Sequence, residues 1–243
     1  MTPNIDAVAQ APATRSKSRW AISLALGSVL FLLIVLSSTL LPVLIAGAHP
    51  PAGYHAATGL VQALLVPVAL ALALRLVGWR LGDIGLTHRN WRSDVPIGLV
   101  VAVVFAIIQF ALIIPATGGA TRSDVAVNSA QIGHSLAGVA AFVLLAWTGS
   151  LTEELFFRGH FLSTLEMLLG GGHRATAASV VATTLLFAAL HGYQGVAGVI
   201  DTGLYGGLGL TLLYLWRGRR LTAGIVAHAG WNTLATIGIY LWY

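Results

Sequence analysis

The stretch Ser150-Leu-Thr-Glu-Glu-Leu-Phe-Phe-Arg-Gly159 places three ionisable side chains inside a long apolar run. These side chains are Glu153, Glu154 and Arg158. A charged group in the hydrocarbon of a bilayer is costly unless it is paired or hydrated, and such groups usually face the interior of a helix bundle. The stretch therefore predicts helices packed around these three side chains, and it marks the place where a function should be sought.

The composition predicts an integral membrane protein. Of the 243 residues, 57% are hydrophobic and only 9% are charged, whereas an average soluble domain carries about 25% charged residues. The net charge of +5 comes from short basic clusters between apolar runs, which is typical of membrane topology and argues against nucleic acid as a partner. The chain has no cysteine, so disulfides and thiolate-bound metals are excluded. We expect an all-α, polytopic transmembrane helix bundle in contact with the lipid bilayer.

Apolar runs predict about seven membrane spans, with an eighth possible inside the long fourth run. We interpret residues 1–19 as a flexible cytoplasmic tail and residues 20–243 as a single membrane domain, with the motif-bearing core in about 134–243. After the third span we expect a loop rich in Gly, Thr and Ser that extends through Asn128. The spans cover approximately residues 20–46, 56–77, 97–114, 134–169, 175–191, 196–216 and 221–242.

The fourth run is too long for a simple span. As one helix it would measure roughly 54 Å at 1.5 Å per residue, against about 30 Å for the hydrocarbon core. We therefore expect a kinked, tilted or interfacial continuation that carries Arg158 and Glu166.

Basic residues cluster in alternate loops between the predicted spans, and Arg122 is the single exception. The positive-inside rule relates such clusters to the cytoplasmic side. The pattern predicts a multi-pass protein of the cell membrane with its N-terminus in the cytoplasm.

Helical spacing separates the roles of the three charged residues in the opening stretch. Glu154 and Arg158 are four residues apart, so they share a helix face in the order that favours an ion pair. Glu153 points about 100° away, given 3.6 residues per turn. A carboxylate without a cationic partner is available as a general base. We interpret Glu154 as the structural partner of Arg158 and Glu153 as the reactive group.

Two later segments also embed polar groups in apolar helix. Phe187 and His191 are four residues apart, and Gly224, His228 and Asn232 share a face of the last predicted span. His228 and Asn232 can both donate hydrogen bonds, and two convergent donors in a dry site stabilise an oxyanion. His191 could share a proton with a water molecule beside the reactive carboxylate, and the glycine leaves room one turn before His228.

The seven-span arrangement contains a geometric conflict. It puts His191 near the outer end of its span and His228 nearer the cytoplasmic end of its own, roughly 10–15 Å apart in depth at 1.5 Å per residue. Either the fifth span begins outside the core, or the last helix starts well below the membrane surface.

The three motifs, Glu153-Glu154-Leu-Phe-Phe-Arg158, Phe187-Ala-Ala-Leu-His191 and His228-Ala-Gly-Trp-Asn232, occur in an order that resembles one known family. It is the family of CAAX-type prenyl endopeptidases and bacteriocin-processing proteins, also called the Abi or CPBP family of intramembrane proteases. The resemblance covers roughly residues 150–232. It implies a glutamate-dependent endopeptidase that needs no cofactor and cleaves a membrane-associated peptide or protein.

In such an enzyme, Glu153 with His191 would activate water, and His228 with Asn232 would bind the oxyanion. Glu154, Arg158 and Phe187 would then support the site rather than react. The oligomeric state does not follow from the resemblance.

Other functions use the same residues. Glu153, His191 and His228 could hold Zn²⁺ in an intramembrane metalloprotease, although the chain has no His-Glu-x-x-His motif. A proton-coupled transporter or a non-catalytic membrane protein could use them as a proton relay, but the halves show no inverted repeat. An inactive relative that only binds a peptide is a third alternative.

The remaining polar residues of the spans receive structural interpretations. We expect Gln109 and Trp231 to pack between helices, although Trp231 could also line the cleft. Asp201 could be an acid that supports the site from behind the reacting groups, but we expect it to be hydrated or to cap a helix. His160 is expected at the membrane interface or in a loop.

Overall fold

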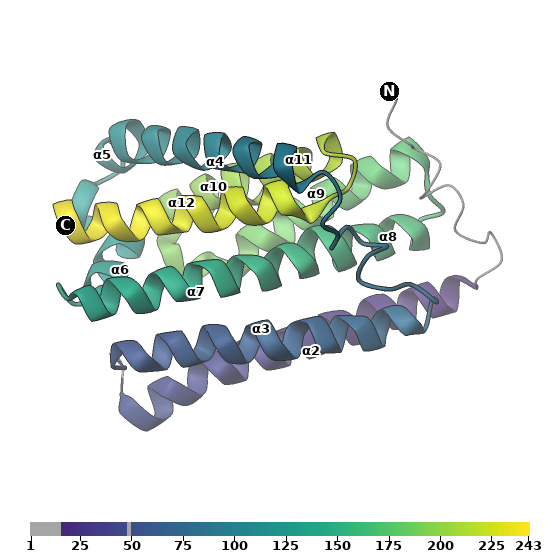
Figure 1. The fold of residues 1–243 in the computed structure, drawn as a ribbon, viewed down its shortest axis with the longest axis horizontal. Coiled ribbons are helices and arrows are strands. Elements are labelled where there is room, and N and C mark those ends of the chain that lie inside the picture. Colours follow the sequence, from purple (N-terminus) through teal and green to yellow (C-terminus); the bar gives the residue numbers. More distant parts are fainter. Residues whose placement is uncertain (1–15, 48–49) are drawn as a thin grey trace.

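The computed structural model describes residues 16–47 and 50–243. Within these ranges every regular element is a helix, which confirms the all-α prediction. Most of the predicted flexible tail, residues 1–15, lies outside the described residues. Figure 1 labels the main helices, and a segment marked η is a 3₁₀ or π-helical turn.

The elements follow one another along the chain with short connections. In order they are α2 (Lys17–Ala46), α3 (Ala52–Arg75), α4 (Trp91–Ile108), η1 (Gln109–Ile113), α5 (Ile114–Ala116), η2 (Gly119–Thr121), α6 (Ser123–Ile132), α7 (Leu136–Glu154), η3 (Leu155–Leu162), α8 (Ser163–Leu168), α9 (Gly172–Leu190), η4 (Gly192–Gln194), α10 (Gly195–Thr202), η5 (Gly203–Gly209), α11 (Leu210–Trp216) and α12 (Leu221–Trp242).

Six helical segments of the described chain are long and apolar enough to cross a membrane. They correspond to the first six predicted spans, so the chain is a multi-pass membrane protein. The predicted seventh span is α12, a helix of 22 residues. It is not among the six, because polar side chains such as His228 and Asn232 interrupt its apolar sequence.

The helices run lengthwise through the molecule in a bundle (Figure 1). Helix α12 packs against α4 on one side and α7 on the other, so it is central. Helix α3 packs against α7, while α2 packs against α3 and α8. The helix with the later histidine motif is thus held between two apolar helices.

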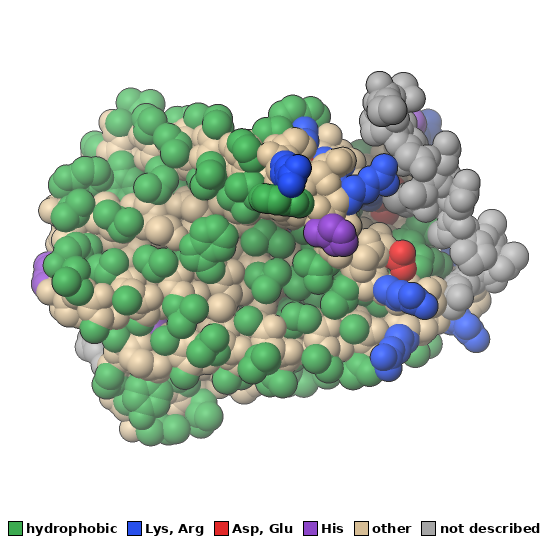
Figure 2. All heavy atoms as spheres, viewed as in Figure 1, with side chains coloured by type: hydrophobic (Ala, Val, Ile, Leu, Met, Phe, Trp, Pro, Cys, Tyr) green, Lys and Arg blue, Asp and Glu red, His purple; other side chains and the backbone are tan. Residues whose placement is uncertain are grey.

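Large aliphatic side chains cover the outside of the bundle. Leu64 is 70% exposed and Val196 is 79% exposed, which in a membrane protein is the surface that contacts lipid tails. Figure 2 shows hydrophobic side chains over most of one face, while Lys and Arg gather at the end that carries α8. This asymmetry fits a bilayer-spanning body with one basic end.

The core beside the opening stretch is aromatic. Phe31 of α2 stacks on Phe156 of η3, with ring centroids 3.9 Å apart. His160 is wholly buried in the same segment, against the prediction that it is interfacial. Its ring occupies the space that Gly27 leaves, because a Cβ at that glycine would lie 2.3 Å from the ring. The absence of a side chain at Gly27 lets α2 approach the helix closely.

The long fourth run is one continuous helix with an internal irregularity. It extends from Leu136 to Leu168, and its middle part, η3, has π-helical geometry. A π-segment adds a residue to the turn and is frequent at functional sites. The expected change in the helix near Arg158 is therefore a π-segment.

The loop predicted after the third span contains helix α6. Val125 and Ile132 of α6 are buried beside Ile114 and Ile239, so this short helix is stabilised by an apolar face. The prediction of a loop through Asn128 is wrong for this part, because the apolar side chains of Val125 and Ile132 pack as one face of a helix.

Ion pairs fix the basic end of the bundle. Asp94 of α4 is wholly buried and pairs with Arg217 and Arg220, each at 2.8 Å. These two arginines lie in the connection between α11 and α12. The carboxylate therefore joins the start of α4 to the start of α12.

Replacing Asp94 with Asn should destabilise the protein. It leaves two arginines without their counter-charge, at a cost of about 1–3 kcal/mol, less than for a fully buried pair because both arginines are partly exposed. Thermal unfolding in detergent should show a lower Tm. The control is Asp83→Asn, since Asp83 is exposed and an Asn there keeps an acceptor. Equal Tm values for the two variants would contradict the assignment.

Candidate active site

Arg158 is the largest fully buried side chain of the described residues. Its Nη1 donates to Glu154 Oε1 at 2.7 Å, as the i,i+4 spacing predicts. The guanidinium also lies over the ring of Phe187, 4.7 Å from its centroid, where the ring face attracts a cation. The first and second motifs therefore meet at this side chain.

Arg158 donates further hydrogen bonds to the glycine-rich element η5 and to the start of α11. The guanidinium donates to the carbonyl of Gly206, to the carbonyl of Gly207 at 3.2 Å, and to Thr211 Oγ1 at 3.3 Å. These partners were not predicted, although the run Gly203–Gly209 is visible in the sequence. Because η5 is π-helical, its carbonyls are displaced from regular helical positions.

The glycines of η5 allow close packing against helix α9. A Cβ at Gly203 would lie 3.1 Å from Ala188, and one at Gly207 would lie 3.2 Å from Thr184. Both neighbours belong to α9. The glycines therefore bring the carbonyls of η5 and the helix that carries the second motif to the same place.

Glu154 is wholly buried and has two cationic or donor partners. Besides Arg158, its Oε1 faces His228 Nδ1 at 3.0 Å. A carboxylate accepts hydrogen bonds and does not donate them, so Nδ1 of His228 carries the proton. Gly224 leaves the space for this carboxylate, since a Cβ there would lie 2.9 Å from Glu154 Oε2. The space that we predicted at Gly224, one turn before His228, is occupied by the carboxylate of Glu154.

Glu153 lies beside this pair with its carboxylate less engaged. Its Oε2 is 3.9 Å from His228 Nε2, and its side chain is 30% exposed. That oxygen has no hydrogen-bond partner among the described residues. A separation of 3.9 Å is too long for a direct hydrogen bond, but one water molecule can contact both atoms. His228 thus lies between the two adjacent glutamates.

His191 ends helix α9 and stacks on the ring of Phe187, with centroids 4.5 Å apart. Its Nδ1 lies 2.7 Å from the carbonyl oxygen of Phe187. A carbonyl only accepts, so Nδ1 is the donor and Nε2 remains available. No hydrogen bond or ion pair joins His191 to Glu153 within the described part of the chain, so the direct partner of Glu153 is His228.

Asn232 follows His228 by one helical turn on α12 and is half-buried. Its backbone carbonyl accepts a hydrogen bond from Thr236 at 2.9 Å. Its side-chain amide forms no hydrogen bond with residues 16–47 or 50–243. The amide can therefore donate to another molecule.

The depth conflict of the seven-span arrangement disappears in the folded chain. The ring of Phe187 lies 6.1 Å from the ring of His228, so the second and third motifs are at one level. Figure 1 shows that the hairpin of α8 and α9 extends along the bundle beyond the start of α12. The fifth span therefore begins farther along the bundle than the last helix, an offset that both alternatives require.

The zinc alternative needs Glu153, His191 and His228 around one ion. Among the described residues, no group of three or more His, Cys, Asp or Glu side chains is placed to hold a metal ion. Glu153 and His228 approach each other, but among the described residues no hydrogen bond or ion pair joins His191 to either of them. The donor set does not fit a three-ligand metal site in this arrangement.

The comparison with protein families agrees with the motifs. Residues 134–234 match the family model described as type II CAAX prenyl endopeptidase Rce1-like. Neither the comparison with curated proteins nor the comparison with solved structures found a match. The matched segment contains Glu153, His191, His228 and Asn232, and it confirms the family resemblance. Residues 134–234 are therefore similar to the Rce1-like type II CAAX prenyl endopeptidases, a family of peptidases, and they lie within a bundle of apolar helices.

Proposed function

We propose that this intramembrane endopeptidase cleaves a membrane-associated peptide or protein with a water molecule activated by Glu153. The observation that carries the proposal is the unequal use of two adjacent carboxylates. Glu154 is held by Arg158 and His228. Glu153 Oε2 has no hydrogen-bond partner in the described chain and faces His228 Nε2 at 3.9 Å.

In the first step, the water oxygen attacks the carbonyl carbon of the scissile bond while its proton passes to Glu153. The carbonyl oxygen becomes an oxyanion. Asn232, whose amide has no hydrogen bond to the described residues, donates to that oxyanion, and His228 donates from Nε2 when the ring is protonated. Two donors placed in advance stabilise the developing charge better than water does.

In the second step, the carbon–nitrogen bond breaks and Glu153 returns the proton to the leaving amine. The carboxylate is then regenerated, and no covalent intermediate forms with the enzyme. His191 assists by orienting the attacking water, since its free Nε2 can accept a hydrogen bond from the second O–H group of that water. Glu154 and Arg158 act by holding His228 and the helix in place.

Glu153→Gln should abolish most turnover without unfolding the protein. Loss of a general base lowers the rate by about 10²–10⁴-fold, while the partly exposed side chain contributes little to stability. The assay uses purified protein in detergent with a peptide library that includes prenylated and unprenylated members. His191→Ala should also lower turnover. Wild-type turnover in both variants would refute the proposal.

Glu154→Gln is the matched comparison at the adjacent position. It leaves the wholly buried Arg158 without its counter-charge, which costs about 3–5 kcal/mol. Its Tm should therefore fall, whereas the Tm of Glu153→Gln should stay near that of the wild type. The reverse order of Tm values would exchange the roles of the two acids.

We propose a mechanism that does not depend on a metal ion. Turnover should then be unchanged after treatment with a strong chelator and removal of bound metal. Loss of turnover that Zn²⁺ restores would overturn this mechanism in favour of a metalloprotease.

We also propose that the N-terminus and the basic end lie in the cytoplasm, with the protein in the cell membrane. The chain has no cysteine, so single-cysteine variants report topology without background. In intact cells a membrane-impermeant maleimide should label Ala120→Cys, while Arg89→Cys should react only after permeabilisation. Both positions are exposed. The opposite labelling pattern would invert the orientation.

A further inference from the structure

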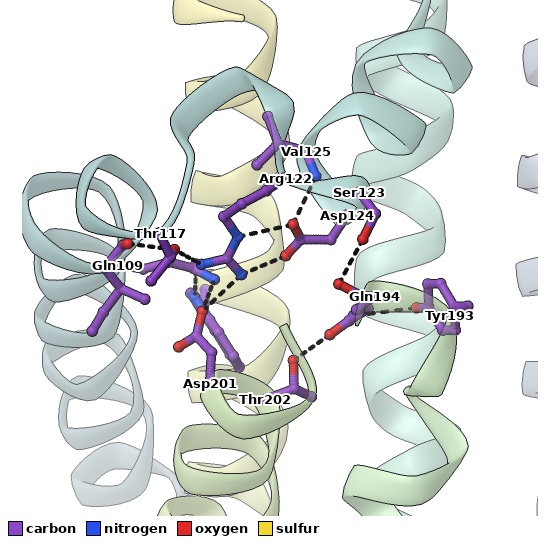
Figure 3. A network of polar contacts seen from close by, with 12 residues as sticks. Gln109, Thr117, Arg122, Ser123, Asp124, Val125, Tyr193, Gln194, Asp201 and Thr202 are labelled. Atoms are coloured by element: carbon purple, nitrogen blue, oxygen red, sulfur yellow. Dashed lines mark hydrogen bonds and ion pairs between the residues drawn. The ribbon is translucent and has the colours of Figure 1, made fainter. Parts of the chain in front are cut away.

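A chain of buried polar side chains connects the segment 117–124 to the helix that carries His228. This segment lies near the C-terminal end of α12, opposite the basic end of the bundle (Figure 1). Figure 3 shows Arg122 at the centre of the network, between residues of η1, α6 and α10. None of these residues belongs to the three family motifs except Trp231, which lies between His228 and Asn232.

The network begins at Trp231. Its Nε1 donates to Gln109 Oε1 at 2.6 Å, and Gln109 Nε2 donates to Asp201 Oδ2 at 3.1 Å. The indole only donates and the carboxylate only accepts, so the amide of Gln109 has one orientation that satisfies both. Gln109 is the first residue of the π-segment η1. Rotation of α12 about its axis would break this connection.

Arg122 holds the far end of the network. It donates to Asp201 at 3.2 Å, to both oxygens of Asp124 at 3.0 and 2.7 Å, and to Thr117 at 2.9 Å. The side chains of Arg122 and Asp201 are 3% and 2% exposed. The hydrogen bond to Asp124 raises the pKa of Arg122 above its ordinary value, so its charge is retained. Asp201 is therefore a buried ion-pair partner, and the prediction that it is hydrated or caps a helix is wrong.

The same segment also holds the turn that follows His191. Ser123 Oγ donates to the carbonyl of Gln194 at 2.8 Å, and Gln194 N donates to the carbonyl of His191 at 2.9 Å. The side chain of Gln194 accepts from Thr202 at 2.5 Å. Residues 117–124 are thus connected to both elements that carry a candidate catalytic histidine.

We propose that Arg122 and Asp201 are positioning residues that set the distance between His191 and the His228–Asn232 pair. Neither touches the reacting groups. They act through Trp231, whose ring lies 6.3 Å from that of His228, and through the turn after His191. The inference rests on the proposed catalytic roles of His191, His228 and Asn232. A displacement of about 1 Å in such a site can cost roughly 10²-fold in rate.

The experiment compares Asp201→Asn, Arg122→Gln and Arg122→Lys with the wild type. Its substrate is the member of the peptide library that the wild type cleaves fastest. Asp201→Asn and Arg122→Gln should lower kcat by about 10- to 100-fold, with KM within about twofold because substrate contacts are unchanged. Arg122→Lys keeps the charge and should recover part of kcat. All assays are run well below the Tm of each variant.

The matched control is Arg217→Gln, which removes an ion pair at the opposite end of the bundle. It should lower the Tm and leave kcat near the wild-type value. If Asp201→Asn or Arg122→Gln fails to fold, Trp231→Phe makes the same test, since it removes the indole N–H and keeps an aromatic ring. A lower kcat at unchanged KM supports the proposal there too.

Wild-type kcat in the folded network variants would refute the positioning role, as would an equal loss of kcat in Arg217→Gln. This failure is distinct from failure of the proposed function. If Glu153→Gln is inactive while the network variants are fully active, the catalytic roles stand and only the positioning role is lost. If Glu153→Gln is fully active, the proposed mechanism itself is wrong.

Discussion

The buried guanidinium of Arg158 imposes a constraint that most of the site satisfies. A charge removed from water needs an opposite charge and a partner for every donor. Glu154 supplies the charge, while the carbonyls of Gly206 and Gly207 and the hydroxyl of Thr211 accept the remaining donors. The helices that carry these partners must therefore meet around one side chain.

This requirement explains two irregular helices. Arg158 lies in the π-segment η3, and its backbone partners lie in the π-segment η5. The glycines of η5 allow α9 to pack closely, which brings Phe187 over the guanidinium. The second motif reaches the site because the ion pair and the glycine surface place it there.

The adjacent glutamates acquire different surroundings from the same geometry. The side chain of Glu154 points into the bundle, where its carboxylate contacts Arg158 and His228. The next residue, Glu153, faces a partly exposed space beside the other nitrogen of His228. A single histidine thus lies between a carboxylate that is held in an ion pair and the carboxylate that we propose as the reactive group. The polar network through Trp231 contacts the helix on which that histidine lies.

The sequence by itself determined the membrane bundle, the approximate spans and the Glu154–Arg158 pair, because hydropathy and helical spacing are local properties. It also identified the three motifs, which all lie within the segment that matches the family model. The tertiary structure decided that His228 lies between Glu153 and Glu154, that His160 is buried against Gly27, and that Asp201 pairs with Arg122. These contacts join residues that are at least 74 positions apart and lie in different segments of the bundle. Helix periodicity contains no information about which faces meet. The π-segments were also decided by the tertiary structure, since they depend on how neighbouring helices satisfy buried polar groups rather than on the local sequence alone.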